Sequence, residues 1–79
     1  MNRKIKQIDP NKWYHLESLK KYFSDCKMQT DVQRNDNDKE FTFVTFKCLW
    51  LNYVFITHPK TKRLKRVTPA TFAEVGFNY

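Results

Sequence analysis

The sequence predicts an α+β fold in which an antiparallel sheet of three to four strands carries an N-terminal helix packed on one face and a short C-terminal helix. Apolar residues recur at spacings of three and four over residues 10–26, which is the helical period, and at a spacing of two over residues 27–33 and 39–50. With 79 residues the chain is expected to form a single domain over 1–79, with residues 1–8 as a flexible arm or an edge strand.

Both predicted helices begin with a capping residue followed by proline. Asp9 can cap the first turn while Pro10 takes the first helical position, and Thr68 with Pro69 repeats this signature for residues 68–75. Gly76 is expected to end the second helix. The apolar stripe of the first helix consists of Trp13, Leu16, Leu19, Phe23 and Cys26, and that of the second includes Phe72, with Phe77 packing back.

The segments between the helices have strand character. Residues 27–33 alternate between polar and less polar side chains, and the Asn and Asp residues at 35–38 favour a hairpin turn. Over 39–50 both faces of the strand are apolar, with Thr42, Val44, Phe46, Cys48 and Trp50 on the face expected to meet the first helix, and Phe41, Phe43, Thr45 and Lys47 on the other. Residues 59–62 predict a second turn before a polar strand at 63–67, whereas 47–58 could be strand or helix.

The two cysteines, Cys26 and Cys48, are far apart and form no CxxC pair. Neither a disulfide framework nor a zinc ribbon is indicated, so both are expected to be reduced thiols in the core. No apolar stretch follows the first basic residues, and the most apolar window, 48–56, is too short to cross a bilayer. These features predict a cytoplasmic protein.

Positive charge is concentrated in the second half of the chain. The net charge is +7, and residues 41–79 hold six basic residues against one acidic residue. Five of the six fall within seven positions: Lys60, Lys62, Arg63, Lys65 and Arg66. A cluster of this kind can bind the phosphates of a polyanion, and the alternative is a solvated loop.

Residues 39–46 resemble the ribonucleoprotein consensus of the RNA recognition motif, a basic residue followed by alternating aromatic positions. The resemblance covers residues 5–46 and implies an alternative fold, a βαββαβ sandwich. It also implies that Lys39, Phe41 and Phe43 contact bases while Val44 and Phe46 enter the core. The alternative for Phe41 and Phe43 is burial under the C-terminal helix.

The function that these features favour is non-enzymatic RNA binding, with exposed aromatic rings contacting the bases and single-stranded RNA as the preferred partner. Duplex DNA is less favoured because the first predicted helix balances its basic residues with acidic ones. No catalytic group, metal or cofactor is expected, since His15, His58, Cys26 and Cys48 lack the short spacings of a zinc site. The predicted nucleic-acid-binding residues are Lys39, Phe41, Phe43, Lys47, Lys60, Lys62, Arg63, Lys65 and Arg66.

A second hypothesis comes from the general style of the chain. A small, basic, aromatic and glycine-poor sequence resembles accessory proteins of phages and mobile elements. That resemblance implies an inhibitor or adaptor that binds and neutralises a host or defence protein in the host cytoplasm, with exposed aromatic residues as its anchors.

Overall fold

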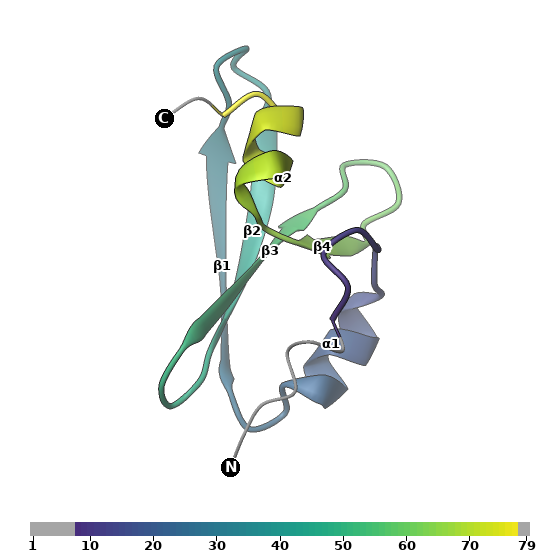
Figure 1. The fold of residues 1–79 in the computed structure, drawn as a ribbon, viewed down its shortest axis with the longest axis vertical. Coiled ribbons are helices and arrows are strands. Elements are labelled where there is room, and N and C mark those ends of the chain that lie inside the picture. The colour runs from purple at the N-terminus through teal and green to yellow at the C-terminus, as the bar shows by residue number, and fades with distance from the viewer. Residues whose placement is uncertain (1–7, 78–79) are drawn as a thin grey trace.

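The sheet of this protein is a simple antiparallel meander with one helix at each end of the chain. A computed structural model describes residues 8–77, so the arm or edge strand expected at 1–8 lies, apart from Ile8, outside the described residues. The elements are α1 (Leu16–Tyr22), β1 (Lys27–Arg34), β2 (Glu40–Lys47), β3 (Asn52–Thr57), β4 (Leu64–Arg66) and α2 (Pro69–Glu74). The strand order is β1-β2-β3-β4, as Figure 1 shows, and the predicted α+β fold is confirmed.

Strand β2 separates two apolar clusters on opposite faces of the sheet. In its pairing with β3, Val44 lies opposite Phe55 and Phe43 lies opposite Ile56. Because successive side chains alternate between faces, the two pairs belong to different faces. The α1 face holds the larger cluster, made of Ile8, Leu19, Phe23, Val44, Phe46, Tyr53, Phe55 and Leu64, and the α2 face holds Phe41, Phe43, Ile56 and Phe77. The predicted partition of β2, with Val44 and Phe46 facing the first helix, is confirmed.

Helix α1 is shorter than the predicted helix because its expected start forms a turn instead. Asp9 and Pro10 occupy the positions that these residues favour in a β-turn, and the backbone N–H of Lys12 donates to the Asp9 carbonyl at 3.1 Å. Tyr14 then pairs with Leu64 through two backbone hydrogen bonds of 2.7 and 2.8 Å. The segment before α1 is therefore extended along β4.

The late start of α1 leaves Trp13 outside the helix and so divides the predicted apolar stripe. Leu19 and Phe23 are buried against the sheet, as predicted. Trp13 is not part of the core. Its side chain is 37% exposed, and its ring makes an edge contact of 5.1 Å, between centroids, with His58. Tertiary pairing with β4 has thus overridden the helical spacing.

The β1–β2 hairpin turns on Asn35, as the run of Asn and Asp residues predicts. Its Oδ1 accepts hydrogen bonds from the backbone N–H groups of Asn37 (2.9 Å) and Lys39 (2.8 Å). Asp38 adopts the left-handed conformation with φ 62°. The Asn35 Nδ2 group donates to the carbonyl of Val75, so the same side chain also holds the end of α2.

Helix α2 has the boundaries that its caps predict. The Thr68 side chain accepts from the backbone N–H of Thr71 at 3.3 Å, which satisfies a free donor of the first turn. Beyond the helix, Gly76 has φ 85°, and the N–H of Phe77 donates to the Phe72 carbonyl at 2.9 Å. This arrangement is typical of a glycine-terminated helix, and it directs Phe77 into the cluster on the α2 face.

The segment whose conformation the sequence left open is a strand over residues 52–57. Strand β2 passes into β3 through a short connection at 48–51, and the N–H of Cys48 donates to the Leu51 carbonyl at 3.0 Å. The element order therefore differs from the βαββαβ order of the alternative fold, in which a helix follows Phe46.

We expect Gly76→Ala to lower the free energy of unfolding by about 2 kcal/mol, because an L residue at this left-handed φ is strained and its Cβ would lie 2.9 Å from Asn35 Nδ2. Urea denaturation measures the change. Adding Asn35→Ala to Gly76→Ala should remove the steric part, so the two changes should not be additive. Equal stability of Gly76→Ala and the unaltered protein would contradict this account.

Candidate nucleic-acid interface

Phe41 and Phe43 are core residues. They are 8% and 5% exposed, and both rings pack against Phe77, with centroid distances of 6.0 and 5.6 Å. The expectation that these rings are exposed for base stacking is therefore wrong, and the alternative, burial beneath the C-terminal helix, is confirmed. The physical reason is that α2 and the residue following its glycine cap cover this face of β2. Replacing either residue by alanine would therefore change the packing of the core and would not report on base stacking.

Three of the predicted cations project from the β3–β4 connection. We call Lys60, Lys62 and Arg63 the basic turn, and all three are exposed. His58 organises it, because its Nδ1 accepts hydrogen bonds from the backbone N–H groups of Lys60 (3.1 Å) and Thr61 (3.2 Å). Its carbonyl accepts from the N–H of Lys62 at 3.0 Å, and Lys62 has a left-handed φ of 63°. The turn therefore has a defined conformation.

The next two cations of the predicted cluster do not continue the basic turn. Lys65 lies opposite Ile56 and Arg66 opposite Phe55, so their side chains leave opposite faces of the sheet. The Lys65 ammonium lies 3.6 Å from Glu74 Oε1, and its side chain is only 12% exposed. Arg66 is half-buried and lines a shallow pocket of about 300 Å³ between β3, β4 and α2.

Lys65 also lies over an aromatic ring. Its Nζ lies 5.6 Å from the centroid of the Trp13 ring, within the range of a cation–π contact. The same ring touches His58, which shapes the basic turn. A partly exposed Trp therefore lies against the histidine that orders the basic turn. Sequence spacing concealed this proximity, because the pairing of Tyr14 with β4 creates it.

The remaining predicted cations lie away from the basic turn and from each other. Lys39 precedes β2 and Lys47 ends it, and the eight residues of β2 span about 25 Å. Figure 1 shows the β1–β2 turn, the β2–β3 connection and the β3–β4 connection at three separate places around the twisted sheet. Of the predicted cations, the structure therefore brings together Lys60, Lys62 and Arg63 on one turn, while Lys65 pairs with Glu74.

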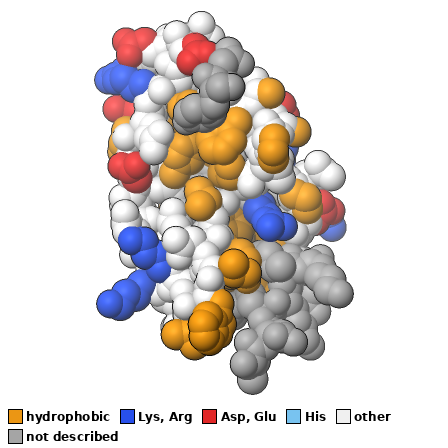
Figure 2. Space-filling view, turned by 60° about the vertical axis from the view of Figure 1, so that its left-hand side comes forward, with side chains coloured by type: hydrophobic (Ala, Val, Ile, Leu, Met, Phe, Trp, Pro, Cys, Tyr) orange, Lys and Arg blue, Asp and Glu red, His pale blue; other side chains and the backbone are white. Residues whose placement is uncertain are grey.

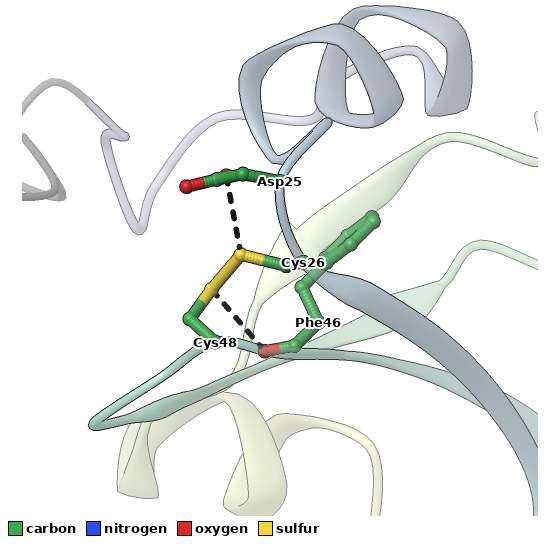
Figure 3. The surroundings of a disulfide bond; sticks show 4 residues. All are labelled: Asp25, Cys26, Phe46 and Cys48. Atoms are coloured by element: carbon green, nitrogen blue, oxygen red, sulfur yellow. Dashed lines mark hydrogen bonds between the residues drawn. A yellow bond between two sulfur atoms is a disulfide. The ribbon is translucent and has the colours of Figure 1, made fainter.

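Cys26 and Cys48 form a disulfide bond, which corrects the expectation of two reduced thiols. They occupy the position next to the Lys27–Lys47 pair of the β1–β2 ladder. Their Cα atoms are 4.7 Å apart, close to the separation of a non-hydrogen-bonded antiparallel pair. In Figure 3 the bridge lies between Asp25, whose Oδ1 is 3.5 Å from Cys26 Sγ, and the backbone of β2. Sequence spacing missed the bridge because only the hairpin register makes the two residues neighbours.

The β2–β3 connection exposes three consecutive large apolar side chains. Leu49, Trp50 and Leu51, which we call the apolar tip, are 86%, 85% and 60% exposed. Trp50 was expected on the core face of β2, and this expectation is wrong because the strand ends at Lys47 and the chain turns back. Residues 48–51 contain no Gly, Pro, Asn or Asp, so no strong turn signal marks this connection, although Asn52 follows it. Figure 2 shows hydrophobic side chains gathered at the lower end of the molecule, where this hairpin ends.

Within residues 8–77, no three His, Cys, Asp or Glu side chains are grouped as metal ligands would be. His58 accepts two backbone hydrogen bonds in the basic turn, and His15 is an exposed residue that precedes α1. No helix in this part of the chain is long and apolar enough to cross a membrane.

Comparison with known proteins adds no relative: no protein-family model, curated protein or solved structure matches this chain. The proposed function therefore rests on the surfaces of this chain itself.

Removing the disulfide bond should cost stability. The bridge closes a segment of 22 residues, for which the loop-entropy estimate is about 3 kcal/mol. We expect the double variant Cys26→Ala with Cys48→Ala to have a free energy of unfolding lower by about this amount, measured by urea denaturation. The reduced unaltered protein serves as control and should approach the variant. A reductant without effect on the unaltered protein would contradict the bridge.

Proposed function

We propose that this protein is a small, non-enzymatic RNA-binding protein that contacts the phosphates of single-stranded RNA through the basic turn. The observation that carries the proposal is the arrangement of Lys60, Lys62 and Arg63, three exposed cations on a turn of defined conformation. Between residues 41 and 73 the sequence has no carboxylate that could neutralise them. Such a turn offers donors to a phosphate backbone at little conformational cost.

The stacking surface of the proposal is Trp13, in place of the two buried phenylalanines. Its ring is partly exposed and lies against His58 at the base of the basic turn. A base of a single strand can stack on an aromatic ring while its phosphates contact nearby cations, and stacking is tolerant of sequence. Lys65 is paired with Glu74, so it is neither free to follow the RNA backbone nor counted among the phosphate contacts.

The salt dependence of binding tests the phosphate contacts. We expect Lys60→Gln with Arg63→Gln to lower the affinity for a labelled single-stranded RNA and to reduce the slope of log K against log salt by about 1.4, since each phosphate contact to a single strand contributes about 0.7. The matched control is Lys20→Gln with Lys21→Gln, which removes the same charge from two exposed residues of α1 outside the predicted binding set. A DNA duplex of the same length measures the preference for single strands.

Replacement of each exposed tryptophan separates stacking from charge. Trp13→Ala should weaken RNA binding by about tenfold with little change in the salt slope, since stacking of one base is worth about 1–3 kcal/mol. Trp50→Ala is the control and should bind RNA normally. If the unaltered protein binds no RNA even at low salt, the proposal is wrong and the inhibitor or adaptor that binds a host or defence protein becomes the function to pursue.

We also propose the cytoplasm as the compartment of RNA binding. Thiols there are normally reduced, so the Cys26–Cys48 pair would exist as two adjacent thiols in that environment. Alkylation of intact cells before lysis measures this directly, and we expect both cysteines to be modified. A protein that is fully protected from alkylation would overturn the cytoplasmic proposal without affecting the RNA measurement.

A further inference from the structure

We propose that the apolar tip, together with Lys27 and Lys47, forms an anchor that inserts into the surface of an anionic lipid bilayer. Both lysines are exposed and lie directly opposite each other at the last pair of the β1–β2 ladder, just before the tip. The proposal concerns the end of β3 away from the basic turn, so it is independent of RNA binding.

The shape and composition of the apolar tip favour a bilayer as its partner. Three adjacent apolar side chains, each more than half exposed, project from the end of a hairpin that closes with the Cys48–Leu51 hydrogen bond. A projecting tip of this kind can enter lipid without a matching pocket in its partner. Trp is enriched at membrane interfaces because its ring is apolar while its N–H can stay hydrated, and the two leucines would lie with it among the acyl chains.

The lysine pair adds a preference for anionic lipids. Like charges directly opposite each other on two strands are unfavourable, and the structure nevertheless keeps Lys27 facing Lys47. Lipid phosphates and carboxylates beside the pair would relieve that repulsion. Each lysine near an anionic membrane surface strengthens binding by about fivefold, so the pair is expected to contribute roughly thirtyfold.

The base of the tip is already ordered, which limits the conformational cost of insertion. The Lys27–Lys47 pair ends the β1–β2 ladder and the N–H of Cys48 donates to the Leu51 carbonyl, so the tip starts from paired backbone whether or not the cysteines are joined. Where they are oxidised, the disulfide between Cys26 and Cys48 also ties β1 to the start of the tip. In Figure 3 the bridge spans the two chain segments at the base of the hairpin connection. An exposed apolar loop that keeps its conformation loses less entropy on binding than a flexible one.

Charge along the long axis would orient the molecule with the tip toward the membrane. The hairpin end opposite the tip carries Asp36, Asp38 and Glu40. Arg34 lies 3.4 Å from Asp38 and 3.7 Å from Glu40, and with Lys39 this end has two basic residues against three acidic ones, a net charge of −1. Figure 2 shows most of the red acidic side chains in the upper half, where one blue group lies among them, and the other blue basic side chains lower down. An anionic surface would therefore attract the tip end and repel the other.

Vesicle binding tests the anchor. We would use the full chain carrying Trp13→Phe, so that Trp50 is the only tryptophan, with vesicles of phosphatidylcholine alone or with about 30% phosphatidylserine, a composition that gives a negative surface potential. We expect Trp50 fluorescence to shift to shorter wavelength, and the protein to float with the vesicles, only when phosphatidylserine is present. Neither effect with anionic vesicles would overturn the proposal and would favour a protein partner for the tip.

Substitutions identify the residues responsible. Leu49→Ser with Leu51→Ser should reduce vesicle binding by more than tenfold, whereas Val32→Ser, at another exposed apolar residue of the sheet, should leave it unchanged. Lys27→Gln with Lys47→Gln should lower binding to anionic vesicles by roughly thirtyfold, and Lys60→Gln with Arg63→Gln, which removes the same charge, should lower it much less. If both double variants lost the same amount of vesicle binding, the attraction would depend on net charge alone. That result would contradict an anchor at the tip.

These experiments distinguish failure of the RNA-binding proposal from failure of the lipid anchor. Loss of RNA binding in the basic-turn variant, with vesicle binding intact, would support two surfaces at opposite ends of β3. RNase treatment before the vesicle assay provides the remaining control, since binding that disappears with RNA would be bridged by nucleic acid and would overturn the lipid anchor.

Discussion

The pairing of β1 with β2 determines most of what the rest of the molecule can do. Asn35 accepts two backbone hydrogen bonds in the turn and thereby sets which residues face each other along eight pairs. A shift by one residue would exchange the faces of every side chain on one strand. The observed register places Cys26 beside Cys48 and Lys27 opposite Lys47, so the covalent bridge and the charged pair at the base of the tip both follow from one turn.

Asn35 also connects this turn to the end of the chain. Its Nδ2 donates to the Val75 carbonyl, and the N–H of Asp36 donates to the carbonyl of Gly76 at 2.9 Å. These bonds hold α2 over the upper half of one sheet face, while α1 covers the lower half of the other, as seen in Figure 1. Strand β2 is consequently covered by Phe23 on one side and Phe77 on the other. A small protein buries a smaller fraction of its surface than a large one, and burying both faces of β2 increases that fraction.

Because helices pack on both faces of β2, its aromatic rings are not open to a ligand. An open, aromatic sheet face of the kind used to stack bases is not available here, because the rings of β2 stabilise the core. The two surfaces proposed for binding therefore lie at connections between strands, with Trp13 beside one of them. The basic turn is ordered by His58 and the apolar tip by the disulfide and the Cys48–Leu51 hydrogen bond, so each is a short loop held by the sheet.

The sequence by itself determined the α+β class, the alternation of β2, the turn at Asn35 and both ends of α2, because each of these depends on local period or on a cap within a few residues. It also located the cations of the basic turn. Only the tertiary structure decided that the Asp9–Pro10 start forms a turn, since pairing of Tyr14 with Leu64 competes with the helix. The disulfide, the burial of Phe41 and Phe43 and the exposure of Trp50 likewise depend on register and on packing between distant segments, which no local pattern contains.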